Sequence, residues 1–241
     1  MTGVFTNYEE FIAWAEKSAP DIFHTKILPY PDGELDYIKE SYWCGQESVN
    51  VHTVLGTKHP DYIGLTWGEL LRNGKRMHIN IPLAISNPGY YEGTERKQPT
   101  MYFTAINNQV FIGGDGNHRT CISRFLSNAK EATHIHGVTV YSYATDTVLT
   151  QGSRLIELAI CNSDSTDIKL KAHSPALTRK DGPNYHRQIH DPHIKITNIK
   201  QGSSVDLRTG EEIDALLEAI RNRSRIRRLF TRNNPFRDFV R

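Results

Sequence analysis

The sequence predicts an α/β fold of the α+β kind, in which a small mixed sheet leads through a glycine-rich turn into a helix. Three observations predict it. Residues 101–105 and 110–112 carry the side chains of two adjacent strands. Three glycines within four positions follow at once, at residues 113–116. Residues 120–126 then place apolar side chains on one side of a helix.

The length of 241 residues fits one large domain or one domain with an appendage. We divide the chain into three parts on the order of its expected elements. They are an N-terminal extension packed on the core (1–64), the α/β core (65–150), and a C-terminal region that ends in an arginine-rich helix or tail (151–241).

The N-terminal extension is expected to begin with a helix over residues 7–18. Thr6 and Glu9 have the spacing of a capping box, and Pro20 is expected to end this helix. Residues 28–64 are rich in proline, glycine, aspartate and tyrosine. We expect this stretch to be irregular or to hold short strands.

A second capping box, from Thr66 to Glu69, predicts a short helix that Gly74 ends. Residues 77–83 alternate in polarity and predict a strand, and residues 87–89 predict a turn. These elements lead to the hairpin of the core.

A tight turn at Asn107 and Asn108 is expected to join the two core strands. The sequence signal for the later elements is weaker. We expect strands at 135–144 and 194–199, helices at 153–160 and from Gly210, and a polar loop over 163–193. The last helix has four apolar residues at helical spacing, namely Ile213, Leu216, Leu217 and Ile220.

Composition excludes several classes of protein. The chain is 38% hydrophobic and 23% charged, which allows an ordinary globular core, and no segment approaches the ~18 apolar residues of a membrane span. The first residues lack a basic cluster followed by an apolar run. Three widely spaced cysteines argue against a disulfide framework. We therefore expect a cytoplasmic protein.

Positive charge is concentrated at the C-terminal end. Residues 221–241 hold eight arginines and one acid, so this tail is a solvated helix end, a DNA contact, or a docking segment for an acidic protein partner. The arginines expected to make such a contact are Arg221, Arg225, Arg228 and Arg232.

The glycine-rich turn has the properties of a phosphate-binding site. Glycines permit positive φ and close approach of a ligand, and the start of the next helix offers unpaired N–H groups. A bland strand-to-helix connection would need the same glycines, but His118 and Arg119 in the first turn of a helix favour an anion. The expected nucleotide-binding residues are Gly113, Gly114, Gly116, Asn117, His118, Arg119 and Thr120.

Residues 110–120, VFIGGDGNHRT, resemble the signature of the ParB/sulfiredoxin superfamily, in which a strand leads through a motif such as D-G-x-H-R into a helix. The resemblance implies that Gly116, His118 and Arg119 bind the phosphates of ATP or of another nucleoside triphosphate such as CTP. Asn117 stands where sulfiredoxin-like proteins have their reactive cysteine. Sulfinic-acid reduction is therefore not expected.

The D-G-N-H-R form is similar to that of ParB-like proteins of plasmids and phages, some of which are nucleases. Plasmid fertility-inhibition proteins of this fold are credited with ATPase and DNase activity. The resemblance thus implies nucleotide hydrolysis or metal-dependent DNA cleavage. The alternative is a non-enzymatic regulator, for instance of conjugation, that docks on a protein partner.

Two residues of the motif are candidates for chemistry. Asp115 is a base or a Mg²⁺ ligand, or else it only caps the helix. His118 is a general acid or a phosphate donor. Tyr90 and Tyr91, ahead of the hairpin, are candidates for base stacking or for ordinary packing. Late histidines at 173, 186, 190 and 193 are weak candidates for a metal site.

Overall fold

The computed structural model describes residues 5–130, 133–163, 167–222, 234–236 and 239–240. It is a mixed α/β protein, which confirms the predicted fold class. The chain forms two compact units that interleave along the sequence. Unit 1 comprises residues 1–31, 42–142 and 181–186, and unit 2 comprises residues 32–41, 143–180 and 187–241. The boundary expected after residue 64 lies inside unit 1, and the one after residue 150 lies inside unit 2.

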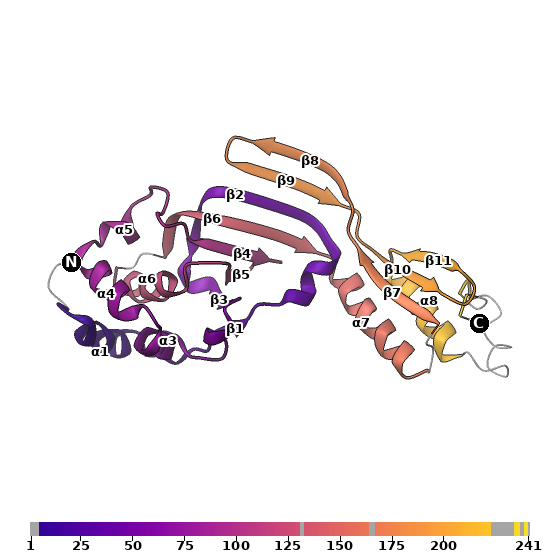
Figure 1. The fold of residues 1–241 in the computed structure, drawn as a ribbon, viewed down its shortest axis with the longest axis horizontal. Coiled ribbons are helices and arrows are strands. Elements are labelled where there is room, and N and C mark those ends of the chain that lie inside the picture. The colour runs from indigo at the N-terminus through magenta and orange to yellow at the C-terminus, as the bar shows by residue number, and fades with distance from the viewer. Residues whose placement is uncertain (1–4, 131–132, 164–166, 223–233, 237–238, 241) are drawn as a thin grey trace. The chain divides into compact units, whose positions relative to one another are not determined.

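Unit 1 holds most of the helices (Figure 1). Its helices are α1 (Tyr8–Ser18), α2 (Pro20–His24), η2 (Val51–Thr53), η3 (Pro60–Tyr62), α3 (Trp67–Asn73), α4 (Met77–Ser86), α5 (Gly89–Glu92) and α6 (Asn117–Lys130). Its strands are β1 (Leu28–Pro29), β3 (Val54–Thr57), β4 (Tyr102–Ile106) and β5 (Gln109–Ile112).

Unit 2 contains η1 (Asp32–Tyr37), α7 (Thr147–Cys161), β7 (Ile168–His173), β10 (His193–Asn198), β11 (Ser203–Leu207) and α8 (Gly210–Arg221). Four strands contribute residues to both units: β2 (Ile38–Asn50), β6 (His134–Thr145), β8 (Ala176–Gly182) and β9 (Tyr185–His190). Among the described residues, no helix is both long and apolar enough to cross a membrane.

The larger sheet is mixed, with the strand order β1-β3-β5-β4-β6-β2-β9-β8. Strand β3 is parallel to β1 and β5, and β5 is antiparallel to β4. The β4–β5 hairpin is confirmed, with Phe103 opposite Ile112 and Ala105 opposite Val110. Its turn residues Asn107 and Asn108 have φ of 48° and 69°, as a two-residue hairpin turn requires.

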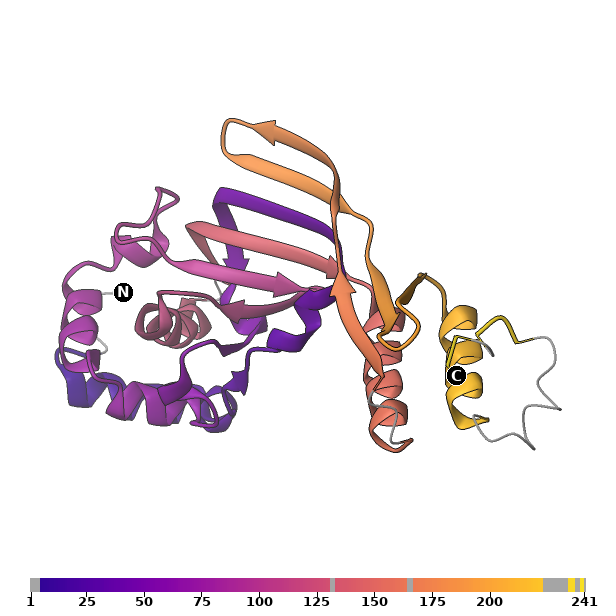
Figure 2. The same cartoon turned by 45° about the vertical axis from the view of Figure 1, so that its right-hand side comes forward.

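Helix α6 lies at the centre of unit 1, with α1, α3 and α4 around it (Figures 1 and 2). Cys121, Ile122 and Phe125 of α6 are fully buried, and the core that they join includes Trp67 and Phe103. The helix extends beyond the predicted 120–126, because its polar first turn carries no apolar signal. The core therefore holds the start of α6 firmly in place.

The first helix is confirmed, but its predicted cap is wrong. Asn7 caps α1 by accepting a hydrogen bond from the Glu10 N–H, and the Thr6 N–H donates to the Glu10 carboxylate. The N-cap is thus one residue later than the predicted Thr6, and its partner is Glu10 in place of Glu9. Pro20 does not simply end the helix, because it occupies the first turn of α2.

The capping box of α3 is confirmed, and Gly74 is its C-cap. The strand predicted over residues 77–83 is wrong, because this segment is the start of helix α4. Met77, Ile81 and Ala84 are buried at helical spacing. Leu83 is 58% exposed, although as an apolar residue it contributes to the alternation that predicts a strand. The turn predicted at residues 87–89 overlaps α5, which begins at Gly89.

Two stretches contain more strand than the sequence predicts. For residues 28–64 it predicts irregular structure or short strands, as β1 and β3 are, and for residues 163–193 it predicts a polar loop. Residues 28–64 contain the thirteen-residue β2, and residues 163–193 contain β7, β8 and β9. Most residues of β2 are exposed or half-buried, and β8 is exposed along nearly its whole length. Without a regularly buried face, these strands lack the alternation that sequence reasoning detects.

Unit 2 packs two helices on a three-stranded antiparallel sheet of order β11-β10-β7. Its core includes Ile156 of α7, Ile194 and Ile196 of β10, and Leu216 of α8. The strands at 135–144 and 194–199 and the helices at 153–160 and from Gly210 are confirmed. The expected continuation of α8 into the arginine-rich tail lies outside the described residues.

Candidate functional site

The glycine-rich turn folds back on the start of β4. The Gly113 N–H donates to the carbonyl oxygen of Tyr102 at 2.8 Å, and the Tyr102 N–H donates to that of Asp115 at 3.1 Å. Gly116 has a φ of 115°, which side-chain-bearing residues rarely adopt. This turn leads into α6, in which Asn117 is buried while His118 and Arg119 are half-buried.

The start of α6 leaves backbone donors unpaired. Its first helical hydrogen bond joins the Thr120 N–H to the Gly116 carbonyl oxygen at 2.8 Å. The N–H groups of Asn117, His118 and Arg119 therefore have no helical acceptor, and no other described residue accepts from them. Asp115 Oδ1 accepts from the Gly116 N–H at 2.6 Å. Of these three donors, those of the half-buried His118 and Arg119 are available to an anion, whereas Asn117 is buried.

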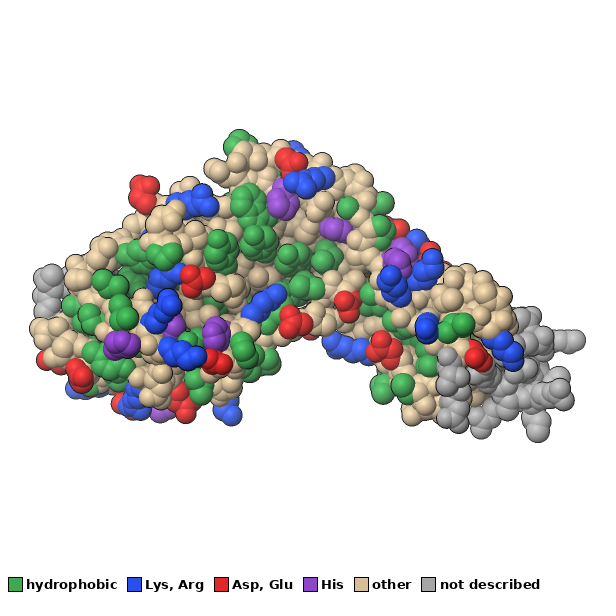
Figure 3. All heavy atoms as spheres, viewed as in Figure 1, with side chains coloured by type: hydrophobic (Ala, Val, Ile, Leu, Met, Phe, Trp, Pro, Cys, Tyr) green, Lys and Arg blue, Asp and Glu red, His purple; other side chains and the backbone are tan. Residues whose placement is uncertain are grey.

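A pocket of about 340 Å³ opens at this helix start. Its walls come from α4, α5, the segment before β4 and the first residues of α6. Basic, acidic and histidine side chains gather beside hydrophobic ones over the region of α4 and α6 (Figure 3). The lining residues are Arg76, Asn80, Leu83, Ala84, Asn87, Tyr90, Tyr91, Gln98, Pro99, Asp115, Gly116, His118 and Arg119.

Only part of the predicted motif faces this pocket. Asp115, Gly116, His118 and Arg119 line it. The other members of the predicted set, Gly113, Gly114, Asn117 and Thr120, do not. Asn117 is buried and its side-chain oxygen accepts a hydrogen bond from Thr57 Oγ1 at 2.6 Å. Thr120 is fully buried, so its side chain packs in the interior.

The Arg119 side chain forms a clamp, in the sense that it hydrogen-bonds several separate segments of unit 1 to α6. Its Nη1 donates to the Tyr90 hydroxyl at 2.7 Å and to the carbonyl oxygen of Pro99, and its Nη2 donates to the Thr100 carbonyl at 3.3 Å. Nη2 also pairs with Asp115 Oδ2 at 2.9 Å, and the side chain is only 11% exposed. The guanidinium expected to bind phosphate therefore already donates its hydrogen bonds to oxygen atoms of the protein.

Asp115 lies at the rim of the pocket with a side chain that is 62% exposed. It accepts from the Gly116 N–H and pairs with Arg119, which is the arrangement of a turn-stabilising carboxylate. It is the sole carboxylate among the described lining residues. No group of three histidine, cysteine or acidic side chains suited to a metal occurs in the described part of the chain.

His118 is half-buried between the pocket and Tyr62. Its Nε2 lies 3.1 Å from the Tyr62 hydroxyl, and the Tyr62 ring stacks on His59 with centroids 4.3 Å apart. Burial lowers the pKa of His118, and the nearby charges of Arg76 and His59 lower it further. The imidazole is thus mainly neutral at pH 7, with one ring nitrogen left for a ligand.

This lowered pKa predicts a pH effect on stability. As pH falls below about 6.5, the unfolded imidazole takes up a proton that folded His118 resists, so protonation favours unfolding. Unit 1 should lose less stability between pH 7 and pH 5 in His118→Gln than in the wild type. Tryptophan fluorescence in urea measures this, because Trp14, Trp43 and Trp67 all lie in unit 1. The exposed His24→Gln is the control; an equal effect there would contradict the assignment to His118.

Sequence reasoning missed Arg76 and Asn80, which come from α4. Arg76 is exposed at the start of that helix and forms no ion pair with a described residue. Because the polarity pattern of residues 77–83 predicts a strand, the sequence does not indicate that this segment is a helix beside the glycine-rich turn. Of the two tyrosines singled out earlier, Tyr90 holds Arg119, and burial raises the pKa of Tyr91.

The remaining predicted residues lie elsewhere. Arg221 ends α8 and is exposed, while Arg225, Arg228 and Arg232 fall outside the described residues. Two of the late histidines, His173 and His193, stack with ring centroids 5.4 Å apart in unit 2. His190 instead bonds to Ser41, with 3.1 Å between the side-chain atoms.

Comparison with protein-family models, with curated proteins and with solved structures gave no match to this chain. The ParB/sulfiredoxin resemblance therefore rests on residues 110–120 and on the order of the elements around them.

Proposed function

We propose that unit 1 binds a nucleoside phosphate, such as ATP or CTP, in the pocket at the start of α6. The observation that supports this most is the meeting of the unpaired N–H groups of His118 and Arg119 with the Arg76 guanidinium and the His118 imidazole around one cavity. Helix N-termini favour negative charge, and an unpaired arginine beside one increases the local positive potential.

The pocket is lined by two chemically different kinds of group. One kind comprises the amide donors at the start of α6, the His118 imidazole and the Arg76 guanidinium. The lining also includes apolar and aromatic side chains, among them Leu83, Tyr90 and Tyr91. A volume of about 340 Å³ is at the lower end of small-molecule sites. A ligand with both an anionic group and a flat apolar base matches this combination of lining groups.

Arg76→Gln should weaken nucleotide binding at least tenfold, because a charge-assisted hydrogen bond contributes about 1.5–3 kcal/mol. Thermal unfolding with a panel of nucleoside mono-, di- and triphosphates measures it. At a ligand concentration near 100 times Kd, wild-type unit 1 should gain about 2.7 kcal/mol of stability. The gain in Arg76→Gln at the same concentration should be clearly smaller.

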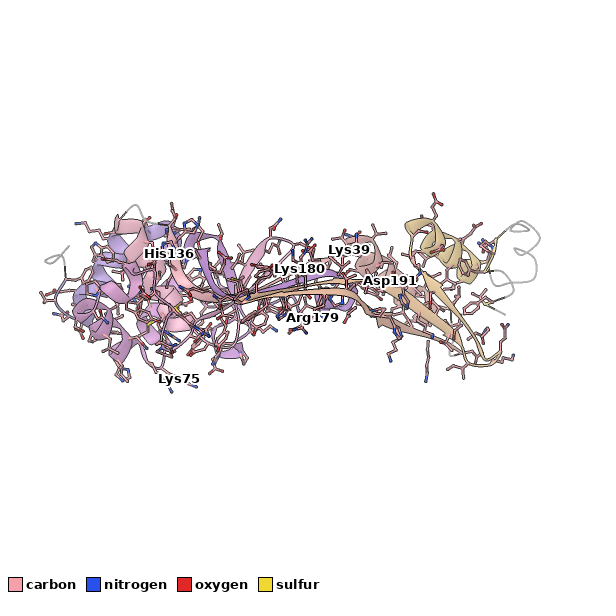
Figure 4. All side chains as sticks on the ribbon, turned by 90° about the horizontal axis from the view of Figure 1, so that it is seen from above. Lys39, Lys75, His136, Arg179, Lys180 and Asp191 are labelled. Carbon is pink, nitrogen blue, oxygen red and sulfur yellow. The ribbon has the colours of Figure 1, made fainter. Side chains whose placement is uncertain are left out.

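Lys75→Gln is the matched control. Lys75 is the sequence neighbour of Arg76 and projects from the surface (Figure 4). It does not line the pocket, and it pairs with Asp61 at 3.0 Å. Its loss removes the same charge near the site without removing a pocket donor. Equal weakening in both variants, or no stabilisation of the wild type by any nucleotide, would overturn the proposal.

Turnover depends on the family resemblance alone. Asp115 as a base or Mg²⁺ ligand, and His118 as an acid, stay predictions, because Asp115 is paired with Arg119. Nucleotide hydrolysis, DNA cleavage and regulation of conjugation through a protein partner also stay predictions. Binding is the step that the geometry supports.

A further inference from the structure

The three-stranded sheet of unit 2 has two chemically different faces. In register, Ile196 of β10 lies between Leu170 of β7 and Val205 of β11, and Ile194 lies between Ala172 and Leu207. These residues belong to the core that α7 and α8 cover. Because side chains alternate along a strand, the residues between them point to the opposite face.

The opposite face is entirely polar. Lys171 lies directly across from Lys195, Lys169 across from Thr197, and His173 across from His193. On the other side of β10, Asp206 faces Lys195 and Ser204 faces Thr197. Figure 4 shows α8 on one side of these strands and side chains projecting from the other. We call the set Lys169, Lys171, His173, His193, Lys195, Thr197, Ser204 and Asp206 the lysine face.

Positive charges outnumber the one acid on this face. Lysines directly opposite on neighbouring strands repel, and such pairs destabilise a sheet. None of Lys169, Lys171 and Lys195 forms an ion pair with a described residue. The one acid of the face, Asp206, lies 3.8 Å from His193 and 3.9 Å from Arg208.

The surroundings of His173 show the same excess of positive charge. Burial lowers the pKa of His173, and Lys171, His193 and Lys195 lower it further against the weaker opposite effect of Asp206. Its Nε2 is enclosed and has no hydrogen-bond partner among the described residues. An anion over the face would relieve this repulsion.

We propose that the lysine face binds the phosphate backbone of a nucleic acid. Alternate residues of one strand lie about 7 Å apart, so Lys169 and Lys171 can contact neighbouring phosphates along a chain. The hydroxyls of Thr197 and Ser204, 3.0 Å apart, add donors of the kind that contact phosphate and sugar. An acidic protein fits less well, because the face offers no apolar side chain for a dry interface core.

The test is fluorescence anisotropy of the full chain with labelled single-stranded and duplex DNA of thirty nucleotides, over a range of salt. Neutralising Lys169, Lys171 and Lys195 together to glutamine should weaken binding about tenfold or more at low salt. The slope of log K against log salt should fall by about 2 to 3, as three lost phosphate contacts require. All three positions are partly or fully exposed, so the sheet should survive.

The control removes the same charge from other exposed lysines, at positions 17, 26 and 75 of unit 1. A further variant replaces the arginines at 223, 225, 227, 228 and 232 with glutamine, which tests the tail separately. The proposal is overturned if the lysine-face variant binds like its control, or if binding depends on the tail alone. Binding of anionic vesicles or polyglutamate with no binding of DNA would also overturn it.

Discussion

Arg124→Met should lower the free energy of unfolding of unit 1 by about 3 kcal/mol, because it removes a buried charged donor from two carbonyl oxygens, of which that of Val51 keeps a bond from the Val54 N–H. Arg124 is 5% exposed, and its Nη1 donates to the carbonyl oxygens of Val51 and Val54 at 2.7 and 2.6 Å. The guanidinium carbon lies 4.4 Å from the centre of the Trp67 ring. Burial lowers the pKa of this guanidinium to about 10, so it remains charged at pH 7.

Urea denaturation followed by tryptophan fluorescence measures this loss. Arg72→Met is the matched control, since Arg72 is 45% exposed, pairs with Glu16 at 2.6 Å and lies over the Phe23 ring. An exposed pair of this kind contributes up to about 1 kcal/mol. Similar losses in the two variants would show that the buried carbonyl bonds of Arg124 are not the reason for its stabilising effect.

The elements predicted well are those with local causes. The hairpin at Asn107 and Asn108 follows from residues that tolerate positive φ, and the α3 cap follows from the spacing of Thr66 and Glu69. The turn around Gly116 follows from glycine alone. Each depends on contacts between residues that are close in sequence, so the sequence is sufficient.

The errors arose where burial depends on distant parts of the chain. Residues 77–83 alternate in polarity, but α6 and α1 bury the helical set Met77, Ile81 and Ala84. Strand β8 is exposed along nearly its whole length, and nothing in its composition marks it as a strand. A sequence pattern records which side chains are apolar, and it does not record which neighbours cover them.

In the candidate site, too, the sequence predicts the features that depend on neighbouring residues and not those that depend on distant residues. The motif predicts the helix start and its free amides, which are local, but Arg76 enters from α4 and the acceptors of Arg119 come from residues 90, 99 and 100. Sequence reasoning could place a guanidinium at the helix start. It could not show that protein oxygens already surround it.

Arg119→Ala should therefore destabilise unit 1 in the absence of any ligand, by about 2–3 kcal/mol. It removes the donors to the Pro99 and Thr100 carbonyls and the bond to the half-buried Tyr90 hydroxyl, which tie α5 and the segment before β4 to α6. Urea denaturation of the ligand-free protein, followed by tryptophan fluorescence, measures the loss.

Arg76→Gln should have the opposite effects on ligand-free stability and on nucleotide binding. Because Arg76 is exposed and pairs with no described carboxylate, its loss should leave ligand-free stability within about 0.5 kcal/mol while it removes most of the nucleotide-dependent gain. If Arg119→Ala instead kept ligand-free stability and lost the nucleotide gain, the guanidinium would be a phosphate ligand and the clamp assignment would be wrong. The two arginines lie at one pocket, so their contrast separates a residue that builds the site from one that binds the anion.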